Sequence, residues 1–402
     1  MLPLDEVRDH VIERCPARSP VSLSLDQVLG LVTGHDIRAT ESIPPFANTA
    51  MDGFALRAAD TRGAPAELQI VETIAAGHAP TRVVGPGQAS RIMTGAVIPD
   101  GADAIVMVER TSVEGDRVSV HIEVPVGNHV RPAGDDIVDG DLVIPRGTVL
   151  GAGHLGVLAS LGMTEVLVHP RPRVGVISTG DELVADGGPL APGQIRDSNR
   201  RTLLSLLARV DAVPVDLGLV ADDEDLIEAA VLDGVSQCDA LVTSGGVSMG
   251  DYDYVKAVLD RIGDMRWMQV AIKPAKPFAF GTVAGVPVFG LPGNPVSSMV
   301  SFELFARTGL RSMMGHGRPV RDTVSAVAGE DLLRTPDGKT HFLRVMATFE
   351  AGGIVVRSAG GQGSHMLWAM AKANALAVVP DGDGCRAGEP VEVLLLESHV
   401  DR

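Results

Sequence analysis

Two turns within residues 241–298 combine glycines with groups that bind anions. An apolar run ends in TSGGVS, where Ser244 and Ser248 flank a glycine pair, and a second apolar run ends in LPGNP. Successive glycines let backbone N–H groups point at an anion, and a helix start adds the positive end of its dipole. The turns predict a phosphate site, although ligand-free tight turns explain the first motif equally well. The residues concerned are Ser244, Gly245, Gly246, Ser248, Pro292, Gly293, Asn294 and Pro295.

Charged residues lie between these two turns. Asp251 and Asp253 precede the apolar positions of a helix. There they could hold Mg²⁺ beside a phosphate, although helix capping is the commoner role of aspartate at such a place. Lys273 and Lys276 each precede a proline, which keeps the loop extended and both lysines out of a helix. In a chain of net charge −17 this arrangement favours an anionic ligand over a solvated surface turn.

A neighbouring strand end is predicted to carry similar groups. The run VGVIS ends in STGDE, so its hydroxyls and carboxylates should lie at the same sheet edge as the TSGG turn. The motif GQIRDSN then predicts Ser198 as a helix N-cap, with the neighbouring Asp197 and Asn199 able to reach a heterocycle or phosphate. The candidate residues are Ser178, Thr179, Gly180, Asp181, Glu182, Ser198 and Asn199. Asp222 precedes the next helix. Helix capping is the ordinary explanation for an aspartate there, and metal binding is the more specific alternative.

Three polar motifs in the first half of the chain look like plain turns when read singly. Asp52 lies in NTAMDGFAL, and a DG hairpin turn accounts for it. Thr94 lies in RIMTGAVIP, and Arg131 and Asp136 lie in RPAGDDI. None of these spacings is distinctive by itself.

Composition limits the functions open to the chain. Acidic residues outnumber basic ones by 51 to 34, which disfavours a general nucleic-acid or anionic-membrane surface. The three cysteines are far apart and predict neither a disulfide framework nor a metal site. No apolar run is long enough for a bilayer span and the first residues carry no apolar signal segment, so a cytoplasmic protein is expected. HExxH, CxxC, GxSxG and Walker A patterns are all absent.

The order of predicted elements indicates a multidomain α/β plus β chain. Residues 173–316 alternate strands and helices, as a doubly wound α/β domain does. Leu25, Val28, Leu29 and Val32 have helical spacing, which assigns the first residues to a discontinuous helical linker. Short alternating strands predict a β-rich insert and a small C-terminal β-barrel. The expected domains are residues 1–45 with 140–168, 46–139, 169–316 and 317–402.

The motifs together resemble the molybdopterin molybdenumtransferases, MoeA in bacteria and the corresponding domain of gephyrin. The resemblance covers nearly the whole chain and rests on eight motifs in the order of the family: NTAMDGFA, RIMTGA, RPAGDDI, ISTGDEL, GQIRDSN, TSGGVSMGDYD, IKPAKPFAFG and LPGNPVS. It implies insertion of molybdate into adenylylated molybdopterin, with Mg²⁺ and with release of AMP. The catalytic residues implied are Asp52, Thr94, Glu182, Lys273 and Lys276, and the metal ligands implied are Glu182, Asp222, Asp251, Asp253 and Asp136.

The resemblance also implies a homodimer. One subunit's α/β domain would face the β insert of the other, so that Asp52, Thr94, Arg131 and Asp136 act in trans. Molybdopterin adenylyltransferase and molybdoenzymes would be functional partners. Two other functions stay open: an adenylyltransferase, whose usual form is a lone α/β domain, and a non-catalytic carrier of the finished cofactor, which would not need the carboxylates.

Overall fold

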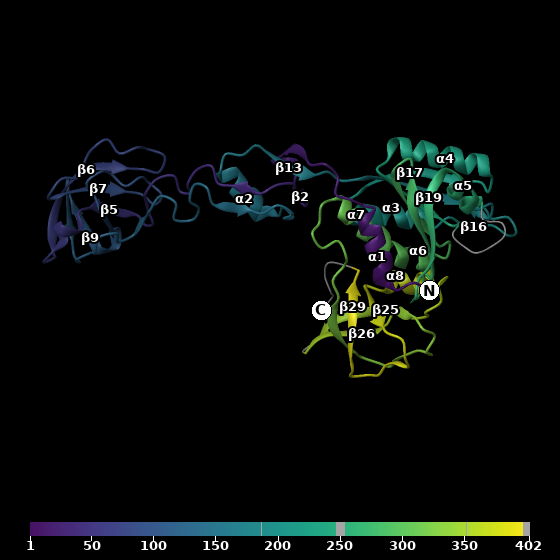
Figure 1. Ribbon diagram of the computed structural model, residues 1–402. Coiled ribbons are helices and arrows are strands. Elements are labelled where there is room, and N and C mark those ends of the chain that lie inside the picture. The colour runs from purple at the N-terminus through teal and green to yellow at the C-terminus, as the bar shows by residue number, and fades with distance from the viewer. Residues whose placement is uncertain (186, 247–253, 351, 397–402) are drawn as a thin grey trace.

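The chain folds into an elongated molecule with its helix-rich part at one end (Figure 1). The computed structural model describes residues 1–185, 187–246, 254–350 and 352–396. A β-rich insert lies at the far end, and a slender linker joins it to an α/β domain with a C-terminal β-barrel beside it (Figure 1). The predicted site residues Ser248, Asp251 and Asp253 lie outside the described residues.

The α/β domain is built on a six-stranded mixed sheet. Its strands follow the order β17, β14, β18, β22, β21 and β19, and the first four are parallel to one another. The chain order reverses between β14 and β18, because β17 joins β14 on its other side. Ligands bind at such a reversal in open α/β sheets. The bounds are β14 (Arg173–Thr179), β17 (Val213–Val220), β18 (Ala240–Ser244), β19 (Gly263–Gln269), β21 (Pro277–Val283) and β22 (Val286–Leu291).

Helices cover both faces of this sheet, which confirms the doubly wound prediction. One face packs on α3, α6 and α7 with the N-terminal α1, and the other packs on α4 and α5. A π-helical turn at residues 302–306 continues α6 into α7. The bounds are α1 (Leu4–Glu13), α3 (Asn199–Arg209), α4 (Glu224–Gln237), α5 (Tyr254–Ile262), α6 (Pro295–Ser301) and α7 (Arg307–Met313).

The linker contains more strand than the sequence predicted. Leu25, Val28, Leu29 and Val32 do not form the predicted helix, because only Leu25–Gln27 is helical, as a 3₁₀ turn. Val28 and Leu31 are instead buried against strands and the helix α2, so tertiary packing overrides the local spacing. The elements are β1 (Val21–Ser24), β2 (Val32–Thr33), β3 (Ile37–Arg38), β12 (Leu142–Ile144), α2 (Ala152–Ser160) and β13 (Glu165–His169).

The insert is a six-stranded sheet around its own small core. The strands follow the order β8, β5, β7, β6, β10 and β9, and side chains of all of them except β9 pack into the core. A separate pair, β4 and β11, runs beside them. The bounds are β4 (Asn48–Thr49), β5 (Gly53–Leu56), β6 (Ala66–Ile74), β7 (Gln88–Ile92), β8 (Ala104–Met107), β9 (Thr111–Glu114), β10 (Arg117–Val120) and β11 (Val130–Arg131).

The C-terminal region forms the predicted closed β-barrel. Its five strands pair in the cycle β25, β26, β23, β29 and β27, and β27 pairs back to β25. The short strand β20 (Ile272–Lys273) of the α/β domain adds to β25 and joins the two domains. The bounds are β23 (Val324–Ala328), β25 (Thr340–Glu350), β26 (Gly353–Ser358), α8 (Leu367–Lys372), β27 (Ala375–Val379) and β29 (Pro390–Leu395).

Two further short strand pairs lie beside these domains. β15 (Leu183–Val184) pairs with β16 (Ile195–Arg196) beside the α/β sheet. β24 (Leu332–Leu333) pairs with β28 (Gly384–Cys385) beside the barrel. Of the helices in the described ranges, none has the length and apolarity that a membrane span requires.

Candidate active site

A cavity of about 420 Å³ lies at the carboxyl edge of the α/β sheet. It is bounded by the ends of β14, β18 and β22 and by the starts of α3 and α6, so the reversal of strand order coincides with it. Ten residues named from the sequence line it: Thr179, Glu182, Asp197, Ser198, Asn199, Ser244, Gly245, Gly293, Asn294 and Pro295. Five other predicted residues are next to lining residues in the sequence but do not line the cavity themselves. They are Ser178, Gly180, Asp181, Gly246 and Pro292.

Gly245 brings two of the strand ends close together. It has a φ of 99°, and a Cβ there would lie 3.2 Å from the carbonyl oxygen of Thr179. A side chain would therefore meet both an unfavourable backbone conformation and a crowded neighbour. The glycine lets the loop after β18 turn tightly against the end of β14, as an anion-binding turn requires.

A buried ion-pair network holds the start of α3 beneath the cavity. Asp197 accepts hydrogen bonds from the Arg200 backbone N–H and from Arg200 Nε, at 3.1 and 2.9 Å. Arg200 Nη1 in turn donates to both carboxylate oxygens of Asp216, at 2.6 and 2.7 Å. The side chain of Asp197 is 1% exposed and that of Arg200 8%. The guanidinium therefore compensates the buried carboxylate of Asp197 and joins it to Asp216, which is partly exposed.

Three carboxylates form an acidic corner at the ends of β14 and β17. The backbone N–H of Asp222 donates to Asp181 Oδ1 at 3.1 Å, and Glu182 lines the adjacent cavity. Burial, with the negative charges of Asp181 and Glu182, raises the pKa of the Asp222 carboxyl above its ordinary value. Such a corner has the oxygen donors and the excess negative charge that suit a magnesium ion. Within the described ranges, however, no group of three acidic, histidine or cysteine side chains is placed to hold a metal by itself.

Replacing Asp222 by asparagine should stabilise the protein at neutral pH. The folded chain binds the Asp222 proton more tightly than the unfolded chain does, so stability is lost as the pH rises through the raised folded pKa. Asparagine cannot ionise and avoids that loss. The free energy of unfolding in urea should therefore exceed the wild-type value at pH 7, and the difference should shrink toward pH 4. A variant less stable than wild type at pH 7 would contradict this account of the corner.

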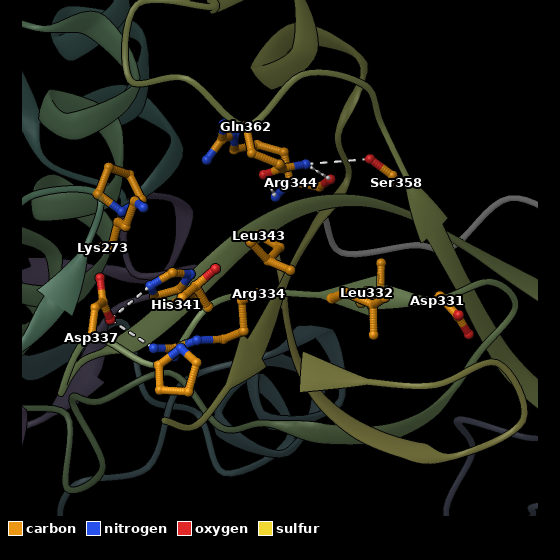
Figure 2. A pocket seen from close by; sticks show the side chains of 14 residues that line it. Lys273, Asp331, Leu332, Arg334, Asp337, His341, Leu343, Arg344, Ser358 and Gln362 are labelled. Atoms are coloured by element: carbon orange, nitrogen blue, oxygen red, sulfur yellow. Dashed lines mark hydrogen bonds and ion pairs between the residues drawn. The ribbon is translucent and has the colours of Figure 1, made fainter. Parts of the chain in front are cut away.

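Lys273 lines a second cavity of about 420 Å³, between the α/β domain and the barrel. Figure 2 shows Lys273 together with His341 and the buried Arg344, which line the same cavity. Arg344 Nη2 donates to the carbonyl oxygens of Gly361 and Gly363, at 3.2 and 3.3 Å. The described contacts of the Arg344 guanidinium include no acidic side chain, and burial lowers its pKa to about 10. Lys276 is exposed and lines neither cavity.

One segment of the barrel separates the two cavities. Gln362 lines the second cavity and His365 the first. Gln362 holds the segment in place, since its side chain accepts from the Arg344 backbone N–H at 2.9 Å and donates to the Arg344 carbonyl oxygen at 3.0 Å. The carbonyl oxygen of Ser364 accepts from the backbone N–H of Val296 at the start of α6. The barrel thereby completes the wall of the site on the α/β domain.

The motifs of Asp52 and Thr94 adjoin the strands β5 and β7 of the insert, which lie at the opposite end of the molecule from the α/β domain (Figure 1), whereas the motif of Asp136 reaches the linker, where Ile137 packs on Leu161. Asp52 immediately precedes β5, and its Oδ1 accepts from the backbone N–H and the Oγ1 hydroxyl of Thr94, at 2.6 and 2.7 Å. The backbone bond and then the hydroxyl bond lower the pKa of Asp52. Arg131 is on β11, and Asp136 follows it in the same loop. These residues do not reach either cavity of their own chain.

Several residues of the two cavities were missed by sequence reasoning. In the first cavity they are Leu183, Ile195, Arg196 and His365, and in the second they include Arg334, Asp337, His341, Arg344 and Gln362. Asp197, in the motif GQIRDSN, was expected to reach a heterocycle or phosphate, and it does line the first cavity. The barrel residues carried no such signal, because only the folded chain brings them to the α/β domain.

The chain matches three family models along most of its length. These are the MoeA N-terminal region (domain I and II) over residues 2–162, a probable molybdopterin binding domain over residues 175–312, and the MoeA C-terminal region (domain IV) over residues 326–396. The three matches follow one another in the order of the sequence without overlap.

Curated relatives and a solved structure are similar over nearly the full chain. A molybdopterin molybdenumtransferase 2 of Mycobacterium tuberculosis is 41% identical, and the match covers 93% of this chain and 95% of the relative. A molybdopterin molybdenumtransferase of Haemophilus influenzae is 38% identical, with 98% of each chain covered. The crystal structure of a molybdopterin biosynthesis MoeA protein from Pyrococcus horikoshii is 29% identical and superposes with a TM-score of 0.83, over 98% of this chain and 100% of that chain.

Proposed function

Because the chain belongs to the molybdopterin molybdenumtransferase family and is a transferase, we propose that it inserts molybdate into adenylylated molybdopterin and releases AMP. Water would cleave the pyrophosphate bond, and the two dithiolene sulfurs of the pterin would replace oxygens of molybdate. No protein nucleophile is needed for either change. The protein's task is then to bind, orient and desolvate several anionic groups.

The observation that carries the proposal is the first cavity, where three backbone turns meet. The loops after β14, β18 and β22 supply hydroxyls and backbone N–H groups, and α6 begins at the same edge with Pro295 as its first residue. Such a cluster suits the phosphate of molybdopterin and the pyrophosphate of its adenylylated form. Arg196, which also lines the cavity, adds a cation.

Magnesium is assigned to the acidic corner beside this cavity. Glu182 and Asp222 would supply carboxylate oxygens, together with Asp251 or Asp253, which lie outside the described residues, and Asp136 from a second subunit. The raised pKa of Asp222 supports the assignment, because burial and the nearby charges of Asp181 and Glu182 both disfavour its ionised form, which a cation would stabilise. Bound there, Mg²⁺ would neutralise the charge that develops on the pyrophosphate.

A divalent ion should therefore stabilise wild type against unfolding more than it stabilises a Glu182→Ala variant.

Molybdate is assigned to the lysine-bearing side of the site. Lys273 lines the second cavity, where the described contacts of the buried Arg344 guanidinium include no acidic side chain. Lys276 lies three residues further on and is exposed, so it can approach an anion from outside. A dianion would compensate the buried guanidinium, which is costly to leave unpaired. The segment that carries Gln362 and His365 separates this cavity from the phosphate side.

The active site is proposed to be shared between two copies of the chain. None of Asp52, Thr94, Arg131 and Asp136 lines either cavity of its own chain, and the carboxylate of Asp52 is held at the surface by Thr94. A homodimer in which each insert reaches the partner's α/β domain would bring these groups to the cavity. Asp52 and Thr94, with Glu182, Lys273 and Lys276, are the residues to which we assign catalysis.

The reaction is placed between two classes of partner in the cytoplasm. An adenylyltransferase must supply the adenylylated pterin, and molybdoenzymes must accept the finished cofactor. The three cysteines, Cys15, Cys238 and Cys385, are buried free thiols, which supports a reducing compartment.

The proposed function is tested with adenylylated molybdopterin as the substrate. We expect purified protein to release AMP only when molybdate is added, as measured by chromatography of the nucleotides. With ATP and molybdopterin but no molybdate, no adenylyl transfer is expected. Robust adenylylation would favour the adenylyltransferase reading, and tight pterin binding without AMP release would favour the carrier.

A further inference from the structure

Asn199 joins two of the turns that form the first cavity. It is the first residue of α3, and its Nδ2 lies 2.8 Å from Ser244 Oγ and 2.7 Å from the carbonyl oxygen of Gly293. A carbonyl oxygen only accepts hydrogen bonds, so the atom that faces Gly293 must be the amide nitrogen. This fixes the orientation of the amide. Both protons of the nitrogen are used, one for each loop.

The orientation of Asn199 determines what the Ser244 hydroxyl can do. Since Nδ2 donates, Ser244 Oγ accepts, and its own proton is left over. Within the described ranges no acceptor faces that proton, although Ser244 is only 3% exposed and lines the cavity. A buried hydroxyl in this state is an unsatisfied hydrogen-bond donor, and a ligand in the cavity could accept its proton.

Ser178, at the equivalent end of the neighbouring strand β14, has the opposite arrangement. Its Oγ lies 3.2 Å from Asp197 Oδ1, and Asp197 is also bonded to Arg200. Because an ionised carboxylate only accepts, the Ser178 proton points at Asp197 and away from the cavity. Ser178 is fully buried and does not line the cavity. The two serines looked equivalent in the sequence, yet only Ser244 has a proton to offer a ligand.

We infer that Asn199 is a positioning residue that turns the Ser244 hydroxyl proton into the cavity, where it donates to the phosphate of molybdopterin. The inference rests on the proposed function, since it assigns that phosphate to this cavity. Asn199 itself need not touch the ligand, because both of its amide protons are used within the protein. The same bonds hold the loops after β18 and β22 at a fixed separation.

The inference is tested by replacing Asn199 with aspartate, which has nearly the same shape. A carboxylate cannot donate to Gly293, and it would accept the Ser244 proton that the ligand needs. We expect the dissociation constant for molybdopterin, measured anaerobically by fluorescence titration, to rise about 10- to 100-fold, the usual loss for one hydrogen bond to a charged group. Ser244→Ala should weaken binding by a similar factor, because it removes the same donor.

The double variant separates this role from a merely structural one. With Ser244→Ala already present, Asn199→Asp should weaken binding by a clearly smaller factor than it does in wild type, since no donor is left to redirect and only the lost bond to Gly293 and the added charge remain. Two effects that multiply in full would overturn the inference. Gln237→Glu makes the same amide-to-carboxylate change at the exposed end of α4 and should leave binding unchanged. Thermal unfolding of each variant verifies that it is folded.

The wild-type titration distinguishes the two levels of the proposal. If wild type binds molybdopterin and Asn199→Asp binds it equally well, the positioning role is wrong and the proposed function stands. If wild type does not bind molybdopterin at all, the phosphate does not belong in this cavity, and both the inference and the proposed placement of the substrate are overturned.

Discussion

Replacing Asp52 by alanine is expected to lower molybdate-dependent AMP release by about 100-fold or more, the lower range for loss of a positioned acid or base. The carboxylate is held by two hydrogen bonds from Thr94, and these bonds lower its pKa, so it is ionised at neutral pH. Its other oxygen has no hydrogen-bond partner within the described ranges and faces solvent. The free oxygen of this carboxylate can therefore contact a substrate or metal ion bound to the partner subunit.

Binding should be affected much less than turnover in the Asp52→Ala variant. The cavity that we assign to the pterin phosphate is built by other residues, so the dissociation constant for molybdopterin should change by less than about threefold. Glu72→Ala is a matched control. Glu72 is also an exposed carboxylate of the insert that is held by a threonine, Thr81, and its loss should leave AMP release unchanged. Equal losses in the two variants would mean that Asp52 supports only the insert.

Replacing Arg200 by methionine should destabilise the protein by about 3–5 kcal/mol, the usual cost of removing one partner from a buried ion pair. Asp197 would then be a carboxylate with 1% exposure and no compensating charge, and Asp216 would lose its bidentate partner. The start of α3 carries Asn199, so substrate binding should weaken as well. Equilibrium unfolding in urea at pH 7 measures the first effect.

Two further variants show whether burial is the cause. Arg261 forms a comparable bidentate arrangement with Glu224 and Glu228, but its side chain is 48% exposed. Arg261→Met should therefore cost less than about 1 kcal/mol. Combining Asp197→Asn with Arg200→Met should recover part of the lost stability, because the uncompensated charge is gone. A loss of similar size for the two arginines would contradict the network described beneath the cavity.

The sheet edge could be predicted from the sequence because its signals are local. Apolar runs that end in glycine and hydroxyl residues mark strand ends, and parallel strands bring such ends together. The turns at Ser244 and Gly293 were therefore placed at one edge before their contacts were known. Gly245 is an example: its φ of 99° is a conformation that glycine adopts readily and other residues rarely do, so the glycine itself indicates the turn.

What the sequence did not reveal depends on long-range packing. The residues around Val28 have helical spacing but pack against strands more than a hundred positions away. Arg344 looked like an ordinary strand residue, and only the closed barrel buries it beside Lys273. The different roles of Ser178 and Ser244 also arise in the folded state, since Asp197 and Asn199 determine which hydroxyl proton is free. The amino-acid sequence alone does not show which group donates and which accepts in a hydrogen bond.

The central claim is that each active site takes its α/β cavity from one copy of the chain and its insert residues from another. Mixing two inactive variants, Asp52→Ala and Glu182→Ala, tests it most directly. After subunit exchange about half of the dimers are mixed, and each has one intact site, so roughly a quarter of the wild-type rate of AMP release should return. If subunits exchange and the rate stays at the level of the single variants, the site is not shared between two copies.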